Sequence, residues 1–181
     1  MKGLLALCTT IFLLYEAKLP FALGSCPTYY QPDELQGSAV SLTRTASFNK
    51  AVCSDASGGS CSAAVDGLAD GARLHQWQTS ASHGTGHWFQ LHFHKLFRVN
   101  KMRFKQLSTD YKQIKDMTIR FTTGAGSIQI QLSLQTDQWQ SFRFSARKVN
   151  FMHMTVQSFY TSENLAYGYQ EIEVFEENAG K

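Results

Sequence analysis

Polar and apolar residues alternate without a break over nine positions, from Ser127 to Gln135. Isoleucine and leucine fall on one side of the alternation, and serine and glutamine fall on the other. A period of two residues matches a β-strand, in which successive side chains point to opposite faces of the sheet. The pattern therefore predicts a half-buried strand at Ser127–Gln135. The rest of the chain must supply strands to pair with it.

The same period recurs along the chain. In Trp88–His94, the apolar residues Phe89, Leu91 and Phe93 alternate with Gln90, His92 and His94. Weaker forms of the pattern cover Val99–Phe104, Met117–Thr122, Trp139–Phe144, Val149–Val156 and Glu171–Phe175. Turn residues separate these segments, and no long apolar stripe with helical spacing occurs beyond the N-terminal leader. The sequence predicts an all-β protein, either a β-sandwich or a jelly roll.

Small polar residues dominate the segment from Tyr29 to Gly86, where strand patterns are sparse. We expect this segment to form long loops at one end of the sandwich. Loops on such a scaffold often carry binding sites.

The N-terminus has the three parts of a secretory signal peptide: Lys2, the apolar run Leu4–Tyr15, and the small residues Ala22 and Gly24 before Ser25. Residues 1–24 are therefore predicted to be removed, which leaves a secreted, extracellular domain of residues 25–181. A membrane anchor is the alternative, but Glu16 and Lys18 interrupt the run well before the ~20 apolar residues that a spanning helix needs. Lipidation at Cys26, as in a bacterial lipoprotein, is a second alternative.

Three cysteines remain after the leader: Cys26, Cys53 and Cys61. Cys53 and Cys61 bracket the short polar segment Ser54–Ser60, so a disulfide between them is the simplest pairing in an oxidising compartment. Cys26 would then be a free thiol or would link two chains into a disulfide-bonded dimer.

Charge and loop composition exclude two kinds of partner. The net charge is only +3, and the basic residues are scattered, whereas nucleic-acid binding needs a clustered basic face. The predicted loops Ser54–Ser60 and Ser80–Gly86 are small and polar, so insertion into a membrane is not expected.

Three segments, in the same order as in a known family, resemble the discoidin domain, the coagulation factor V/VIII type C domain of the galactose-binding-like superfamily. They are Ala64-Val65-Asp66-Gly67 followed by Trp77, Trp88-Phe89-Gln90-Leu91 followed by Val99 and Met102, and the closing segment Tyr169–Phe175. The resemblance extends from Cys26 to Phe175 and implies a discoidin-like jelly-roll β-sandwich with long loops at one end.

The chain also departs from the pattern of this family. Cys26 has no partner near Lys181, His92 replaces a usual aspartate, and the spacing between Asp66 and Trp77 is longer. The ligand of a better-known member therefore cannot be transferred to this chain.

The resemblance implies a structural calcium ion held by Asp66, Asp70 and Glu171. The residues themselves are compatible with this, because two aspartates flanked by Gly67 and Gly71 form a loop of oxygen ligands. The alternative is a plain turn in which Asp66 accepts a hydrogen bond from its own backbone.

A sugar site needs an aromatic ring for the apolar face of the sugar and polar side chains for its hydroxyl groups. Within the loop-rich half, the sequence offers Arg44, Arg73, His75, Trp77 and His83 as ligand-binding candidates. The alternative for Trp77 is a place in the core, beneath the loop.

Five histidines and five glutamates are the other residues that could carry metal or catalytic chemistry. A zinc or copper site is conceivable among His75, His83, His87, His92 and His94, but solvent-facing histidines are the more ordinary interpretation. No nucleophile elbow, Cys-His pair, zincin motif or phosphate loop is present, and five glutamates are predicted to lie in loops or at exposed strand edges: Glu163, Glu171, Glu173, Glu176 and Glu177.

The sequence therefore predicts no enzyme, but a secreted binding or adhesion module for a glycan or an extracellular protein. A structural extracellular-matrix or biomineral-associated protein, and a binder of anionic lipid surfaces, are the alternatives.

Overall fold

A computed structural model of the chain describes residues 41–55, 59–80, 84–122, 124, 126–136 and 138–177. The predicted signal peptide, Cys26 and His83 lie outside these residues. The described part contains seven strands and three short 3₁₀ helices, and none of its helices is long and apolar enough to cross a membrane. The strands are β1 (Phe48–Cys53), β2 (Trp77–Gln78), β3 (Trp88–Gln106), β4 (Ile114–Phe121), β5 (Ser127–Gln131), β6 (Trp139–Phe159) and β7 (Gly168–Glu176).

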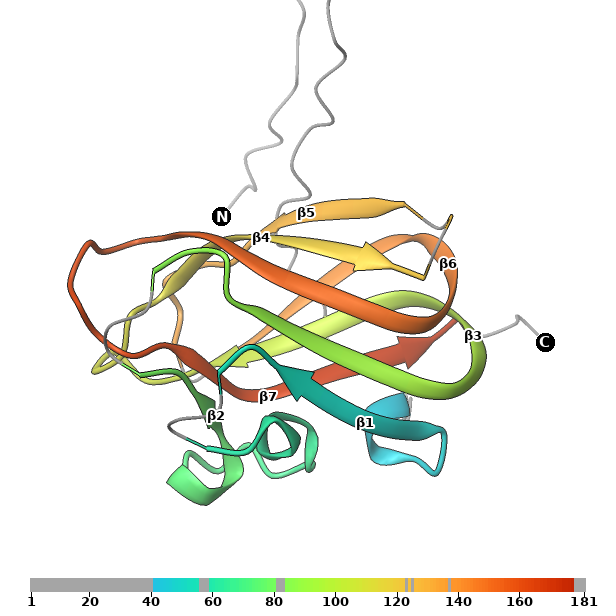
Figure 1. Cartoon of the computed structure of the whole chain (residues 1–181), viewed down its shortest axis with the longest axis horizontal. Coiled ribbons are helices and arrows are strands. Elements are labelled where there is room, and N and C mark those ends of the chain that lie inside the picture. The colour runs from blue at the N-terminus through green and yellow to red at the C-terminus, as the bar shows by residue number, and fades with distance from the viewer. Residues whose placement is uncertain are drawn as a thin grey trace, which may run out of the picture.

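All strand pairs are antiparallel, and the strands follow the order β2-β7-β3-β6-β4-β5, with β1 also paired to β3. Strands β3 and β6 are long enough to take part in two layers. The first part of β3 pairs with β1 and with the last part of β6, whereas its second part pairs with β7 and with the first part of β6. Both strands turn back at one side of the molecule (Figure 1), where the pairing register shifts between His92 and Phe97 and between Val99 and Lys101. The result is the predicted jelly-roll β-sandwich.

The core lies between the two layers and follows the sequence alternation. Phe89, Leu91 and Phe93 are buried on β3, with exposed fractions of 1%, 0% and 4%. Ile130 on β5 and the following Leu132 are also buried, although β5 ends at Gln131 and is shorter than predicted.

Two pairs of predicted strands prove to be single strands. Trp88–His94 and Val99–Phe104 both belong to β3, and Trp139–Phe144 and Val149–Val156 both belong to β6. The residues between each pair bend the strand instead of ending it, because irregular pairing lets the backbone continue through a bend.

The segment before Gly86 contains more regular structure than predicted. It forms β1, β2 and the 3₁₀ helices η1 (Leu42–Arg44), η2 (Cys61–Val65) and η3 (Arg73–His75). A disulfide joins Cys53, at the end of β1, to Cys61, at the start of η2, as predicted. The short strand β2 lies directly against β7, and a Cβ added at Gly168 would lie 1.9 Å from the carbonyl oxygen of Trp77. Only glycine therefore fits at position 168.

The closing strand β7 is buried along nearly its whole length, from Gly168 to Phe175. Glu171 and Glu173, which were predicted at an exposed edge, have exposed fractions of only 0% and 1%. That prediction was wrong because β7 is not an edge strand: β3 pairs with it on one side, β2 pairs with it on the other, and η1 and η2 pack against it. Polar residues on such a strand need internal partners.

Candidate functional site

The predicted calcium residues lie close together, at the loop that follows η2. The backbone N–H of Gly67 donates to Glu171 Oε2 at 3.1 Å, and His75 Nδ1 lies 2.8 Å from Asp66 Oδ2. Asp66 Oδ1 accepts from the N–H of Leu68, and Asp70 Oδ1 accepts from the N–H of Ala72. Asp66 thus accepts a hydrogen bond within its own turn, as in the alternative prediction, and Asp70 does the same. Gly67 has a φ of 88°, which favours glycine at this turn.

The electrostatics of this loop are unusual at two groups. The hydrogen bond that His75 donates to Asp66 raises the pKa of His75 above its ordinary value. Burial raises the pKa of Glu171 to about 8, and its Oε1 atom has no hydrogen-bond partner in the described part of the chain. A buried carboxylate oxygen without a partner is costly, so this oxygen is the one feature of the loop that suits a cation.

Two further oxygens of the loop already have side-chain donors. Lys105 Nζ donates to the carbonyl oxygen of Ala69 at 2.8 Å, and His75 takes the second oxygen of Asp66. Among the described residues, no group of three or more histidine, cysteine, aspartate or glutamate side chains is arranged to hold a metal ion. The loop therefore does not fit calcium as it stands: an ion would first have to displace Lys105 and His75. Calcium at Asp66, Asp70 and Glu171 stays a prediction with that condition attached.

The predicted sugar-binding residues do not assemble into one site. Trp77 has an exposed fraction of 0%, and its Nε1 donates to the carbonyl oxygen of Asp55. Its ring stacks on Tyr169 and packs edge-on against Phe89, so it belongs to the core and offers no surface to a sugar. The assignment of Trp77 as a ligand-binding residue is corrected accordingly.

Arg44 and His75 both lie beside the turn at Gly67, but each is bound to an acidic partner. Arg44 forms an ion pair with the buried Glu173, and His75 binds Asp66. Arg73 is exposed on η3, and His83 lies outside the described residues. The sequence therefore located a charged cluster correctly, but the structure gives most of that cluster a structural role.

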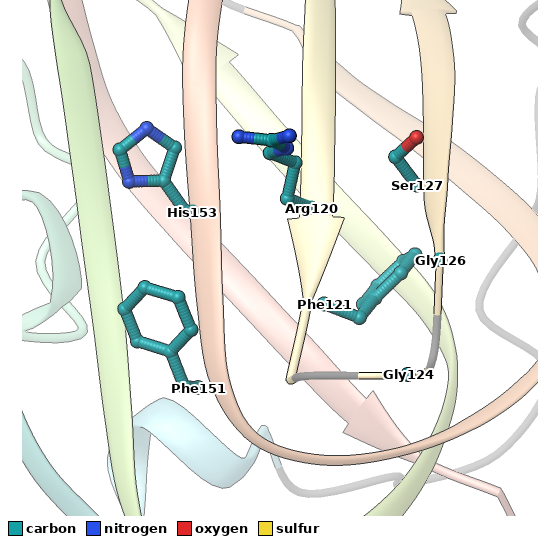
Figure 2. A pocket seen from close by; sticks show the side chains of 7 residues that line it. All are labelled: Arg120, Phe121, Gly124, Gly126, Ser127, Phe151 and His153. Carbon is teal, nitrogen blue, oxygen red and sulfur yellow. The ribbon is translucent and has the colours of Figure 1, made fainter.

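A cavity of about 500 Å³ lies elsewhere, on the outward face of the layer formed by β5, β4, β6, β3 and β1. Figure 2 shows its lining: Phe151 and His153 from β6, Arg120 from β4, Ser127 from β5, and Gly124 and Gly126 from the turn between β4 and β5. The ring of Phe121 also reaches it. Its volume falls within the range of small-ligand sites, which is about 300 to 1,000 Å³.

Strand register brings these side chains into one row. Arg120 is opposite His153 in the β4–β6 pair and opposite Ser127 in the β4–β5 pair, while His153 is opposite Gln90 in the β3–β6 pair. Residues directly opposite one another on antiparallel strands lie on the same face of the sheet. The row Gln90, His153, Arg120 and Ser127 therefore crosses four strands on the outward face.

Hydrogen bonds define which groups of this row remain available. Gln90 Nε2 donates to His153 Nδ1 at 2.9 Å, so the other ring nitrogen of His153 carries the proton when the ring is neutral. Gln90 Oε1 lies 3.3 Å from His92 Nε2 and accepts from it. Burial, and then the charge of Arg120, lower the pKa of His153 below its ordinary value. At neutral pH the ring is uncharged, and its Nε2–H can donate to a ligand.

Aromatic rings flank the row on β3 and β6. The Trp88 ring stacks on His153 with 5.5 Å between centroids, and the His92 ring packs on Phe151 at 5.0 Å. The N–H of Phe151 donates to the hydroxyl oxygen of Thr122, which fixes the backbone beside the cavity. Four side chains in or beside this row point outward and are partly buried: Trp88, His92, Phe151 and His153. Sequence alternation places His92 outward, but no sequence motif singles out Arg120, Phe151 or His153.

Comparison with solved structures identifies the fold. The described chain is similar to a fucose-binding module of Streptococcus pneumoniae, with a TM-score of 0.61 and 14% identity over 80% of this chain and 100% of the module. It is also similar to the lectin domain of lectinolysin, solved with Lewis B antigen, with a TM-score of 0.57 and 18% identity over 71% and 92% of the two chains. A third similar structure is the CBM32 of AlyQ in complex with 4,5-unsaturated mannuronic acid, with a TM-score of 0.56 and 17% identity over 71% and 95%.

These similarities confirm the predicted fold, a jelly-roll β-sandwich. Residues 41–175 match the model of a protein family described as "Domain of unknown function (DUF7402)", and the chain belongs to that family. A comparison with curated proteins gave no match.

Proposed function

We propose that this protein is a secreted, non-catalytic carbohydrate-binding module that acts outside the cell. The observation that carries the proposal is the cavity on the outward face, where Phe151 offers an apolar ring and His153, Ser127 and Arg120 offer directional polar groups. A sugar ring presents one apolar face and many hydroxyl groups, so it needs both kinds of contact. Surface aromatic residues beside such polar groups have no evident role in the core.

The similar structures support the same class of ligand. They are a fucose-binding module, a lectin domain in complex with Lewis B antigen, and a CBM32 in complex with 4,5-unsaturated mannuronic acid. Because the sequence identities are below 20%, we take from these relatives the class of ligand only and not the identity of the sugar.

The chemistry of the cavity supports a binding role without catalysis. Glycoside hydrolysis ordinarily uses a pair of carboxyl groups on either side of the scissile bond. The described lining of the cavity contains no carboxyl group, so it lacks the pair that this reaction ordinarily uses. The disulfide between Cys53 and Cys61 supports export, because such bonds persist in oxidising compartments.

A glycan array tests the proposal. The full chain is produced with its own leader in a secretory host, purified from the medium and applied to neutral and acidic glycans. We expect retention of a defined set of glycans and a mature N-terminus at Ser25. A blank array, from protein that shows a cooperative thermal transition, would overturn the carbohydrate-binding proposal and would favour an extracellular protein partner.

A further inference from the structure

We infer that the cavity binds an acidic saccharide, with the carboxylate or sulfate group of the sugar on Arg120 and the sugar ring against Phe151. This inference rests on the proposed function and specifies the class of ligand and the location of its site. The site lies on the face of a sheet, away from the loop residues Arg73 and His75 that the sequence had suggested.

The charge of the cavity favours an anionic ligand. Arg120 is exposed at the cavity, and no carboxylate among the described residues lies within ion-pair distance of it. Three other arginines have glutamate partners: Arg44, Arg98 and Arg103. A guanidinium without a partner, placed in a concave site, can form two parallel hydrogen bonds to a carboxylate or sulfate group.

The groups around that guanidinium also favour an anionic ligand. His153 and Ser127, its neighbours across the strands, are uncharged at neutral pH, and Lys50 contributes a further positive charge beside His92. The nearest acidic residue on the outward face of β4 is Asp116, four positions away or roughly 13 Å along the strand. Both oxygens of Asp116 already accept hydrogen bonds, from Gln131 Nε2 and from Ser158 Oγ. The potential at Arg120 is therefore positive, and an anion there meets no nearby like charge.

The shape of the outward face along β4 suits an extended ligand. A second depression of about 260 Å³ lies further along the same strands, lined by Asp116, Gln129 and Gln157 among others. The two depressions follow β4, and the outward residues between them, Thr118 and Thr155, are paired across the strands. An oligosaccharide can therefore lie along β4, with a charged sugar at the Arg120 end. A neutral sugar suits the other end, because Asp116 repels a second anion there.

Glycines leave the Arg120 end open. Gly124 and Gly126 have φ values of 85° and 77°, and a Cβ added to either would meet no atom within 4 Å. These two residues therefore place no side chain of their own between solvent and the cavity.

Calorimetric titration of the full, purified chain tests the inference with three probes: an oligosaccharide of uronic acids, a sulfated oligosaccharide, and a carboxyl-reduced, neutral form of the first. Comparison of the first two probes distinguishes carboxylate from sulfate as the preferred anion. We expect an acidic probe to bind at least about tenfold more tightly than the neutral one, with an affinity that falls as salt increases.

Two arginine variants locate the site. Arg120→Gln is expected to lower the affinity for the acidic probe by at least about tenfold and the affinity for the neutral probe by a smaller factor, because glutamine still donates a hydrogen bond to a hydroxyl group. Arg73→Gln is the matched control, because it removes an exposed arginine from the predicted loop site, and it is expected to change neither affinity by more than about twofold. Both side chains are exposed, so both variants are expected to keep the thermal transition of the wild type.

The outcomes separate this inference from the proposed function. Absence of binding to any saccharide contradicts the proposed function itself. Equal affinity for acidic and neutral probes, or unchanged binding by Arg120→Gln, overturns the inference while carbohydrate binding stands. Loss of binding in Arg73→Gln instead would move the site to the loop.

Discussion

Replacing Glu173 with glutamine is expected to destabilise the domain strongly, because its carboxylate holds two arginines at a buried position. Oε1 pairs with Arg44 at 2.5 Å, and Oε2 pairs with Arg103 Nε. The Arg103 guanidinium also lies over the ring of Trp139, 3.9 Å from its centroid. The substitution keeps the size of the side chain and removes its charge.

The size of the effect follows from burial. Glu173 is 1% exposed and Arg103 is 15% exposed, so Arg103 would keep a charge with little water to solvate it. Removing one partner of a buried ion pair costs about 3 to 5 kcal/mol. Glutamine retains one acceptor oxygen, and Arg44 is 37% exposed and can turn to water. We therefore expect a loss near the lower end, about 3 kcal/mol, or about 10 °C in melting temperature.

Denaturation by guanidinium chloride measures the free energy of unfolding, with Glu177→Gln as the matched control. Glu177 pairs with Arg98 just beyond the end of the same strand, but Arg98 is 56% exposed and Glu177 is 32% exposed. Surface pairs of this kind contribute at most about 1 kcal/mol. If Glu173→Gln loses no more stability than Glu177→Gln, the buried network does not stabilise β7 and the reasoning fails.

Four further predictions follow from the site and its loop. Because burial raises the pKa of Glu171, the unfolded chain releases this proton at lower pH than the folded chain does, so stability in chelator is expected to fall from about pH 5 to pH 8. Glu171→Gln should abolish that slope in urea denaturation at several pH values, and an unchanged slope would contradict the assignment. Millimolar calcium is expected to shift the wild-type melting temperature by less than about 1 °C; a rise of several degrees that chelator reverses would show that the ion displaces Lys105 and His75. Replacing Cys53 and Cys61 together with alanine is expected to cost about 2 to 3 kcal/mol, measured against the wild type without reductant, and an unchanged midpoint would show that the bond does not constrain the unfolded chain. Because the pKa of His153 is lowered, its ring gains charge only below its ordinary value of 6.5, so binding of an acidic oligosaccharide should strengthen between pH 7 and pH 5 in the wild type and much less in His153→Gln.

The groups around the His153 ring determine how its charge depends on pH. Arg120 on β4 already favours the neutral form, and Lys50 on β1 acts in the same way on His92. Gln90 on β3 and Ser127 on β5 do not titrate in this range. The gain in binding at low pH should therefore come from His153 and His92, and a flat pH profile in the wild type would exclude both.

Much of the fold was predictable because strand alternation is a local property. Phe89, Leu91 and Ile130 are buried as their spacing predicted. The joining of two predicted segments into β3 was not predictable. The strand continues past His92 because it pairs with β6 again from Phe97 onward, after a shift in register. Partners distant in sequence decide where such a strand ends.

The candidate site was harder to predict for the same reason. Arg120 and His153 are 33 positions apart and become neighbours only through the register of β4 and β6. Each is an ordinary polar residue in its own alternating pattern. The one local signal was Phe151, an aromatic residue that stands two positions before His153 and on the same outward side. Glu171 and Glu173 show the opposite error, because an acidic residue in a strand suggests an exposed edge until the strands on both sides are known.

The bend of β3 and β6 has a mechanical consequence for the proposed binding of an oligosaccharide. The two strands run through the layer that carries the cavity and through the layer that contains β7, the last strand. Separating the two layers would expose apolar side chains to water. It would also break many backbone hydrogen bonds in these shared strands. Tension between a bound ligand and the C-terminal strand is therefore distributed over the whole sandwich. In hydrogen exchange, the two layers should open together as one cooperative unit.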